Sequence, residues 1–170
     1  MKQLILTTIT CLLLTTVYAQ ANKSVFLEIG GNGMAFSANF DSRFTKSEKG
    51  FGYRVGVGGI PPTNSSLDLI YPSTPFVLTV PVGINHLAGK APNYFESGLG
   101  FTYMYTSGVM KSDFWGYEED ITGSYGAFVP SIGYRHAKTG RAFQYRIILS
   151  PVFAKGGTTF WGGFSAGYKF

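Results

Sequence analysis

Apolar side chains recur at every second position in eight successive stretches of the chain. This period of two is typical of β-strands with one apolar face, whereas amphipathic helices repeat every 3.6 residues. In residues 143–153, aromatic and aliphatic side chains at the odd positions alternate with mostly polar side chains at the even positions. The expected strands cover residues 25–30, 34–44, 51–57, 76–85, 95–105, 125–136, 143–153 and 160–170. The pattern predicts an all-β chain without helices.

The length and number of these stretches indicate a barrel that spans a membrane. Tilted strands of about ten residues cross the hydrocarbon layer, and eight antiparallel strands make the smallest barrel of the outer-membrane series. Pro81, Pro130 and Pro151 fall inside expected strands, where each removes a ladder hydrogen bond, so we expect a β-bulge at each. The predicted fold class is an all-β, eight-stranded antiparallel up-and-down transmembrane β-barrel.

The N-terminal residues have the layout of a secretory signal peptide. A single positive charge at Lys2 precedes an apolar run from Leu4 to Val17, and small residues follow. The run is too short to span a bilayer as a helix. We therefore expect residues 1–21 to be a cleaved signal peptide and residues 22–170 to form the barrel. Cys11 is the only cysteine, so no disulfide is expected.

Charged residues in the expected strands fall on the parity opposite to the apolar one. An arginine or lysine that faced lipid at the midplane would cost about 2–4 kcal/mol, so we expect this parity to face the barrel interior. There the acids and bases can pair, and eight strands leave an interior that side chains just fill, so no open pore is expected. The predicted lumen charge network comprises Glu28, Asp41, Arg43, Arg54, Glu96, Arg135, Arg146 and Lys169.

Both ends of an even-stranded outer-membrane barrel lie on the periplasmic side, and this rule assigns every connection to a face. The expected periplasmic turns are residues 45–50, 87–93 and 137–141, and the expected extracellular connections lie near Asn32, at residues 61–75, at residues 107–123 and at Gly156. Both long connections fall outside, which matches the asymmetry of these barrels.

The C-terminal strand, with Phe164, Tyr168 and the terminal Phe170, resembles the signal by which the barrel assembly machinery recognises outer-membrane proteins. The stretch from Val80 to Lys90, followed by residues 96–100, is similar to small barrel proteins common in Bacteroidetes, with an OmpA/OmpX-like architecture. The resemblance implies a location in the outer membrane, with lipid, lipopolysaccharide and the assembly machinery as partners. It implies no activity, because most members of that group have no assigned role.

Residues that would carry chemistry are scarce. Barrel enzymes that modify lipid A use a His with a Ser and an acid near the outer leaflet, whereas His86 and His136 fall at the periplasmic ends of strands. We therefore expect no enzyme, no catalytic residue, no cofactor and no metal site. The bases behind the net charge of +5 do not cluster with stacking aromatics, so no nucleic-acid partner is expected.

The loop at residues 107–123 combines acids with aromatic side chains and offers the best candidates for a surface contact. These candidates are Asp113, Phe114, Trp115 and Tyr117. They would meet an extracellular ligand or partner whose chemistry the sequence leaves open. A solvated loop is the simpler interpretation.

The predicted function is a non-enzymatic, monomeric outer-membrane barrel with an envelope-structural or surface-interaction role through loops 61–75 and 107–123. One alternative is a periplasmic or secreted soluble β-barrel that binds a small apolar ligand inside, and another is a narrow transport pore. The ligand binder requires apolar side chains inside, so inward-pointing Arg54 and Arg146 would count against it.

Overall fold

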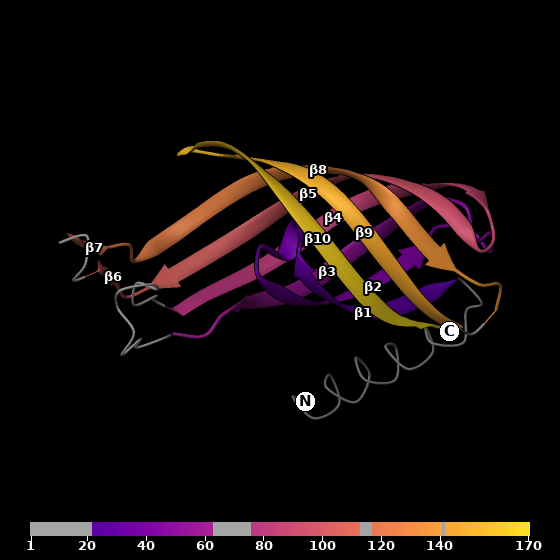
Figure 1. The fold of residues 1–170 in the computed structure, drawn as a ribbon, viewed down its shortest axis with the longest axis horizontal. Helices are drawn as coiled ribbons and strands as arrows, with labels where there is room; N and C mark the ends of the chain where they lie inside the picture. Colours follow the sequence, from indigo (N-terminus) through magenta and orange to yellow (C-terminus); the bar gives the residue numbers. More distant parts are fainter. Residues whose placement is uncertain (1–21, 63–75, 113–116, 141) are drawn as a thin grey trace, which may run out of the picture.

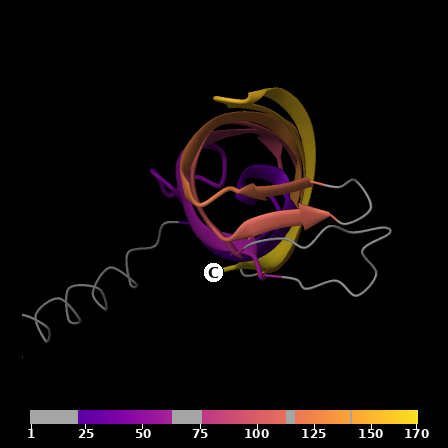
Figure 2. The same cartoon turned by 90° about the vertical axis from the view of Figure 1, so that its left-hand side faces the viewer.

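The computed structural model describes residues 22–62, 76–112, 117–140 and 142–170, and of residues 110–112 and 117–119 it describes only the backbone. Among these residues, eight strands form a closed antiparallel barrel in the order β1-β10-β9-β8-β5-β4-β3-β2 (Figures 1 and 2). They are β1 (Lys23–Gly30), β2 (Phe36–Arg43), β3 (Gly50–Ile60), β4 (Phe76–Lys90), β5 (Asn93–Ser107), β8 (Gly123–Ala137), β9 (Ala142–Ala154) and β10 (Gly157–Lys169). The predicted all-β, eight-stranded barrel is confirmed.

Apolar side chains cover the outside of the barrel, and polar side chains fill its inside. Along β9, Phe143, Ile147 and Leu149 are exposed, whereas Gln144 and Arg146 between them are buried. Successive side chains of a strand point to opposite faces, so the alternation in the sequence becomes an apolar wall around a polar interior. This arrangement inverts the polarity of a protein that folds in water.

Strand boundaries differ from the predicted ones mainly where β4 meets β5. β4 continues to Lys90 and β5 begins at Asn93, so the expected turn at residues 87–93 consists only of the two residues between them. The alternation of side chains explains the extension, because Leu87 and Tyr94 are both buried and pack against each other in one cluster.

The connection expected at residues 107–123 contains a second, two-stranded sheet. β6 (Val109–Ser112) pairs with β7 (Tyr117–Asp120) in antiparallel fashion, from Val109 opposite Asp120 to Ser112 opposite Tyr117. The hairpin projects from the ends of β5 and β8 (Figure 1). We call this the hairpin end of the barrel, and the opposite end, where Asn22 and Phe170 lie, the terminal end.

The prolines inside the strands cause no β-bulges, so that prediction is wrong. A bulge adds one residue to one strand and shifts the pairing. In the β8–β9 ladder, pairs on both sides of residues 129–131 keep one register, and Pro130 lies opposite Pro151 within that interval. Pro81 pairs in register with Thr102 on β5. Because proline has no N–H, placing Pro130 opposite Pro151 confines the missing hydrogen bonds to one gap.

The connection between β1 and β2, which the sequence predicted as an extracellular connection near Asn32, folds into the barrel. Residues Gly31–Gly33 form one turn of 3-10 helix, η2, and all three are buried. Gly30 and Gly31 have φ angles of 72° and 62°, which glycine adopts at little cost, and they direct the chain inward. The glycines that indicated a tight turn thus allow Gly31–Gly33, which we call the plug, to fold into the lumen. None of the described helical segments is long and apolar enough to cross a membrane.

Candidate functional site

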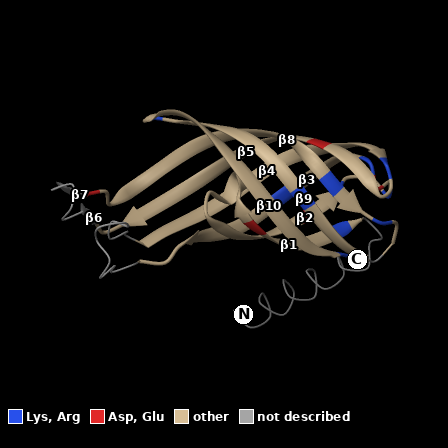
Figure 3. Ribbon diagram, viewed as in Figure 1, with Lys and Arg blue, Asp and Glu red and all other residues tan. Residues whose placement is uncertain are grey.

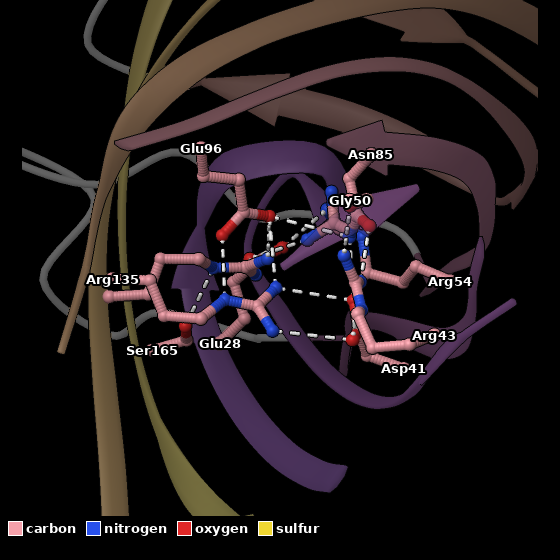
Figure 4. Close-up of polar contacts among 11 residues, drawn as sticks. Glu28, Asp41, Arg43, Gly50, Arg54, Asn85, Glu96, Arg135 and Ser165 are labelled. Carbon is pink, nitrogen blue, oxygen red and sulfur yellow. Dashed lines mark hydrogen bonds and ion pairs between the residues drawn. The ribbon is translucent and has the colours of Figure 1, made fainter. Parts of the chain in front are cut away.

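All eight residues of the predicted charge network are buried, and seven of them form one connected layer, whose polar contacts Figure 4 draws. The charged side chains of this layer are at most 6% exposed. Burial of so many charges is costly unless each finds a partner of opposite sign, so the geometry of the pairs decides whether the layer stabilises the barrel.

Arg135, on β8, lies between two carboxylates. Its Nε and Nη2 atoms donate to Glu96 at 2.8 and 3.0 Å, and its Nη1 and Nη2 atoms donate to Asp41 at 3.2 and 3.1 Å. Both contacts use two parallel N–H groups on a planar guanidinium, the geometry that suits a carboxylate. Arg135 therefore neutralises two buried acids at once, each through two hydrogen bonds.

Arg146, on β9, extends the layer toward β1. It donates to Glu96 Oε1 and to Ser165 Oγ, each at 3.0 Å, and it also forms an ion pair with Glu28. Arg54, on β3, donates to the same oxygen of Glu28 at 3.1 Å. Glu28 thus bridges two arginines, as Arg135 bridges two acids.

Phe26 supplies an apolar support beneath these arginines. The guanidinium carbon of Arg146 lies 4.4 Å from the centroid of the Phe26 ring, and that of Arg54 lies 5.9 Å from it. A cation over an aromatic face is attracted to the ring quadrupole. The ring therefore fills the space beside the ion pairs without leaving a hydrogen-bonding group unpaired.

Arg43 completes the layer on the side of β2 and β3. It donates to Asp41 Oδ1 at 2.7 Å and to the carbonyl of Gly50 at 3.2 Å, and it hydrogen-bonds Asn85. Asn85 in turn donates to Asp41 Oδ2 at 2.5 Å. A Cβ atom at Gly52 would lie 2.4 Å from the Arg43 guanidinium, so glycine at this position makes room for the charge.

Every strand of the barrel contributes a side chain to this layer. The contributors, from β1 to β10, are Glu28, Asp41 with Arg43, Arg54, Asn85, Glu96, Arg135, Arg146 and Ser165. The layer therefore links opposite walls of the barrel through hydrogen bonds and ion pairs that cross the lumen. Each of its four arginines and three acids forms an ion pair with at least one partner of opposite sign.

Lys169, the eighth residue of the predicted network, pairs with an acid outside that prediction. Its Nζ donates to Glu48 Oε1 and to the carbonyl of Lys138, each at 2.6 Å. The Tyr94 hydroxyl and the Gly140 amide also donate to the Glu48 carboxylate, at 2.9 and 3.2 Å. Partial burial raises the pKa of Glu48, but hydrogen bonds from Lys169, Tyr94 and Gly140 outweigh it, so the pKa lies below its ordinary value of 4.5.

Glu48 belongs to the connection between β2 and β3, residues 44–49, and its contacts draw that connection across the terminal end of the barrel. The partners of Glu48 come from β5, from the β8–β9 turn and from the end of β10. We call residues 44–49 the lid. A cavity of about 20 Å³ lies beneath it, beside Asp41 and Arg43, which is the room that one water molecule needs.

On its other side, the charge layer is covered by η2. The Thr79 hydroxyl donates to the carbonyl of Gly33 at 3.0 Å, and the Thr102 hydroxyl donates to that of Asn32 at 2.6 Å. The Gly33 amide donates to Glu28 Oε1 at 3.3 Å, which joins the plug to the charges. Two buried threonines thus supply hydrogen-bond donors to backbone carbonyls of this inward-folded segment.

Above η2 the interior becomes apolar. Ala127, Val129 and Val152 form a buried cluster, and Met34 and Met104 pack against it. Met34 has a φ angle of 71°, unusual for a residue with a side chain, and it directly follows the glycines of the plug. The lumen is thus filled in successive layers: lid, charges, plug and apolar cluster.

Two hollows large enough for a ligand lie on the outer wall of the described barrel. One, of about 810 Å³, runs across β3 to β10 beside Ile84, Leu99 and Leu149, and another, of about 760 Å³, lies over β1 to β3 beside Leu27 and Phe40. A soluble barrel that binds an apolar ligand needs such a space inside, with an apolar lining. Here the inside carries Arg54 and Arg146, contrary to that alternative.

The two histidines do not converge with other catalytic groups. His86 packs on the Phe51 ring at 4.7 Å between centroids, and His136 stacks on Tyr145 at 4.9 Å. Within the described part of the chain, no three His, Cys, Asp or Glu side chains gather as a metal site would require. The charged side chains of the lumen layer are engaged with one another.

The predicted assembly-signal residues lie outside the lumen. Phe164, Tyr168 and Phe170 are exposed on the outer wall of β10 and at its end. Of the candidate surface contacts, Asp113, Phe114 and Trp115 lie outside the described residues, as do the signal peptide at residues 1–21 and most of the loop at 61–75. Tyr117 is the first residue of β7.

The sequence did not predict several neutral members of the site. Asn85, Ser165 and Phe26 lie on the inward parity of their strands, which was a usable signal, but only charged residues on that parity were assigned to the network. Glu48 lies in a turn, where parity assigns no direction. Its role depends on the path of the lid, which the sequence pattern does not encode.

No protein-family model matches the chain, and no curated protein matches it. Among solved structures, it is similar to the N-terminal β-barrel domain of Pseudomonas aeruginosa OprF, with a TM-score of 0.58 and 9% sequence identity. The similarity covers 88% of this chain and 96% of that one. At this identity the likeness shows the fold, an eight-stranded barrel of the OmpA-like architecture. The narrower resemblance to barrels of Bacteroidetes stays a prediction.

Proposed function

We propose that this protein is a non-enzymatic barrel of the bacterial outer membrane, with a sealed lumen and a structural or surface-interaction role in the envelope. The inverted polarity of the wall carries the proposal. Each strand exposes large apolar side chains, for example Leu27, Phe36, Val57, Ile84, Leu99, Ile132, Leu149 and Phe164, while the charged side chains of the barrel strands are buried except at the strand ends Lys23 and Lys90. Lipid favours this surface and water does not.

The closed hydrogen-bond ladder supports the same proposal. In hydrocarbon, each backbone N–H and C=O needs a partner within the protein, and a closed barrel provides one for strands. All eight ladders of the barrel are antiparallel and run in constant register. The fold that the chain shares with the OprF domain is one that suits this environment.

The terminal end is then periplasmic and the hairpin end extracellular, because short turns of such barrels face the periplasm. The β4–β5 and β8–β9 turns at the terminal end are short, whereas the β6–β7 hairpin stands at the other end. In this proposal the signal peptide at residues 1–21 directs export. Phe164, Tyr168 and Phe170 then present the chain to the assembly machinery.

The filled lumen supports a structural role over transport. The charge layer and η2 occupy the interior between the lid and the apolar cluster, so a solute would have to break buried ion pairs to pass. The surface-interaction part of the proposal rests on the β6–β7 hairpin, whose described strands, Val109–Ser112 and Tyr117–Asp120, lie at the proposed extracellular end. No bound cofactor enters the proposal.

Cysteine labelling of living cells tests the proposed orientation. In a Cys11→Ser background, Asp120→Cys marks the hairpin end and Lys138→Cys the terminal end, and both native residues are exposed. A membrane-impermeant maleimide should label Asp120→Cys on intact cells and Lys138→Cys only after lysis. The reverse order would contradict the orientation, and labelling of both in a soluble fraction would contradict the membrane barrel.

Planar-bilayer recording tests the sealed lumen. The purified barrel should give no discrete conductance steps at neutral pH. Steps of reproducible size would favour the transport pore instead and would mean that the charge layer opens.

A further inference from the structure

Exposed lysines mark the terminal end of the barrel. Lys46 and Lys49 lie in the lid, Lys90 ends β4, and Lys138 begins the β8–β9 turn, and all four are exposed. None of the four ammonium groups is paired with an acceptor on the described residues. The acid of this end, Glu48, is already engaged by Lys169. The end therefore presents positive charge, and Figure 3 shows lysine and arginine positions in its connections.

These lysines are distributed around the barrel rather than gathered into a patch. The lid joins β2 to β3, Lys90 stands between β4 and β5, and Lys138 stands between β8 and β9. In the closed order of strands these three connections lie at separate places on the circumference. A partner that docks at one spot would not meet them all, whereas a lipid leaflet that encircles the barrel would.

Exposed aromatic side chains place the lysines at the level of head groups. Phe44 and Phe51 flank the lid, Phe95 follows Lys90, and Phe143 follows Lys138. Aromatic girdles of membrane barrels lie at the interface between hydrocarbon and head groups. A lysine a few residues nearer the end reaches the phosphate level, with its methylene stem along the apolar wall and its ammonium in water.

We propose that the periplasmic rim of lysines, Lys46, Lys49, Lys90 and Lys138, binds the anionic head groups of phospholipids in the inner leaflet of the membrane around the barrel. This inference rests on the proposed function, because only a membrane barrel has a leaflet around it. The attraction is electrostatic, so it strengthens with the fraction of anionic lipid and weakens with salt. It gives the barrel a preferred lipid neighbourhood on one side of the membrane.

Lipid selectivity at the protein boundary tests the proposal. The full mature chain is reconstituted in phosphatidylcholine vesicles that contain spin-labelled phosphatidylglycerol or spin-labelled phosphatidylcholine, and the association of each label with the protein is compared. The parent protein should prefer phosphatidylglycerol severalfold at low salt, since each lysine near an anionic surface contributes roughly a fivefold preference at most. The preference should shrink in concentrated salt.

Two variants identify the source of the preference. The quadruple variant K46Q/K49Q/K90Q/K138Q should bind both labelled lipids equally. Lys155→Gln removes an equally exposed lysine from the β9–β10 turn at the other end and should keep the parent's preference. All the changed side chains are exposed, so both variants should still fold, which their gel migration with and without boiling verifies.

The outcomes separate this inference from the membrane proposal. If the barrel inserts but the quadruple variant keeps the preference for phosphatidylglycerol, the inference about the lysines is overturned. It is overturned too if the inserted parent shows no such preference. In both cases the membrane proposal stands. Binding of soluble polyglutamate to the detergent-solubilised parent but not to the quadruple variant, without lipid selectivity, would also overturn the inference about the lysines, because it indicates an acidic polymer as partner. A protein that gives no boundary-lipid signal in any vesicle contradicts the membrane barrel itself.

Discussion

Lys169 donates a 2.6 Å hydrogen bond to Glu48, a residue 121 positions earlier in the chain. The pair joins the last strand of the barrel to the lid between β2 and β3. Tyr94 and Gly140 donate to the same carboxylate, so four distant parts of the chain meet at one side chain. Glu48 is consequently the residue on which closure of the terminal end depends.

Acidification should loosen the lid. The folded-state pKa of Glu48 lies below its ordinary value of 4.5, so the stabilisation is present above pH 4.5 and is lost as the pH falls through the folded-state pKa. Exchange protection of the Gly140 amide, measured by NMR, should fall in that range. Glu48→Gln should show reduced protection at neutral pH with no further loss on acidification, whereas Lys49→Gln, on an exposed neighbour, should behave as the parent. Unchanged protection in Glu48→Gln would contradict the lid.

Removal of Arg135 should be among the most destabilising single changes in the lumen. Arg135→Met removes four hydrogen bonds to buried carboxylates and leaves Asp41 with only Arg43, and Glu96 with only Arg146, as arginine partners; breaking buried pairs in this way costs about 3–5 kcal/mol. Urea-induced unfolding of the reconstituted barrel measures the loss. Adding Glu96→Gln to Arg135→Met should recover part of it, because one buried charge is then removed. A double variant no more stable than Arg135→Met would show that the two side chains act independently.

Arg54→Met is the matched comparison for Arg135→Met. Arg54 donates one hydrogen bond to Glu28, which keeps its ion pair with Arg146. The free energy of unfolding should therefore fall by less than in Arg135→Met. Equal losses would contradict the bridging role assigned to Arg135.

Alanine at Gly52 should destabilise the barrel although the change adds one methyl group. Its Cβ would lie 2.4 Å from the Arg43 guanidinium and 2.5 Å from the carbonyl of Ser42, so the charge layer must shift. Overpacking of this kind costs about 1–3 kcal/mol. Gly156→Ala, where an added Cβ meets nothing within 4 Å, should leave the urea midpoint unchanged. Similar midpoints for the two variants would mean that the lumen is less tightly filled than the structure indicates.

An arginine on the outer wall should be unfavourable in lipid and harmless in water. Leu27 lies near the middle of β1 and is 70% exposed. Leu27→Arg should cost about 2–4 kcal/mol of stability in vesicles if this surface faces hydrocarbon. Thr45→Arg, in the exposed lid, serves as the control and should cost little. A Leu27→Arg barrel that is as stable as the parent, and more soluble without detergent, would favour a protein that folds in water.

Much of this architecture is predictable from the sequence because period two assigns a direction to each strand residue. Arg54 and Arg146 fall on the parity opposite to Val55 and Ile147, and the structure places them inside as that parity predicts. The face to which a side chain points follows from its position in its own strand, so it can be assigned without knowing which strand pairs with it. The eight-strand count follows from the same pattern.

The plug and the lid were not predictable in this way, because both lie in connections. Gly30 to Gly33 permit a tight turn on either side of the barrel wall. The inward path depends on Thr79 and Thr102, which donate hydrogen bonds to the turn from distant strands. Glu48 likewise finds its partners through folding of the whole barrel. The β-bulges predicted at the prolines were wrong for a related reason. Only the strand register shows that Pro130 lies opposite Pro151, and the sequence pattern does not give the register.

The most direct test of the membrane barrel is the SDS-gel migration of the protein in the outer-membrane fraction, with and without boiling. A folded barrel resists SDS until it is heated. For an outer-membrane barrel we therefore expect recovery in the outer membrane and a different migration before and after boiling. Recovery in the soluble periplasmic fraction, with the same migration in both lanes, would contradict the membrane barrel.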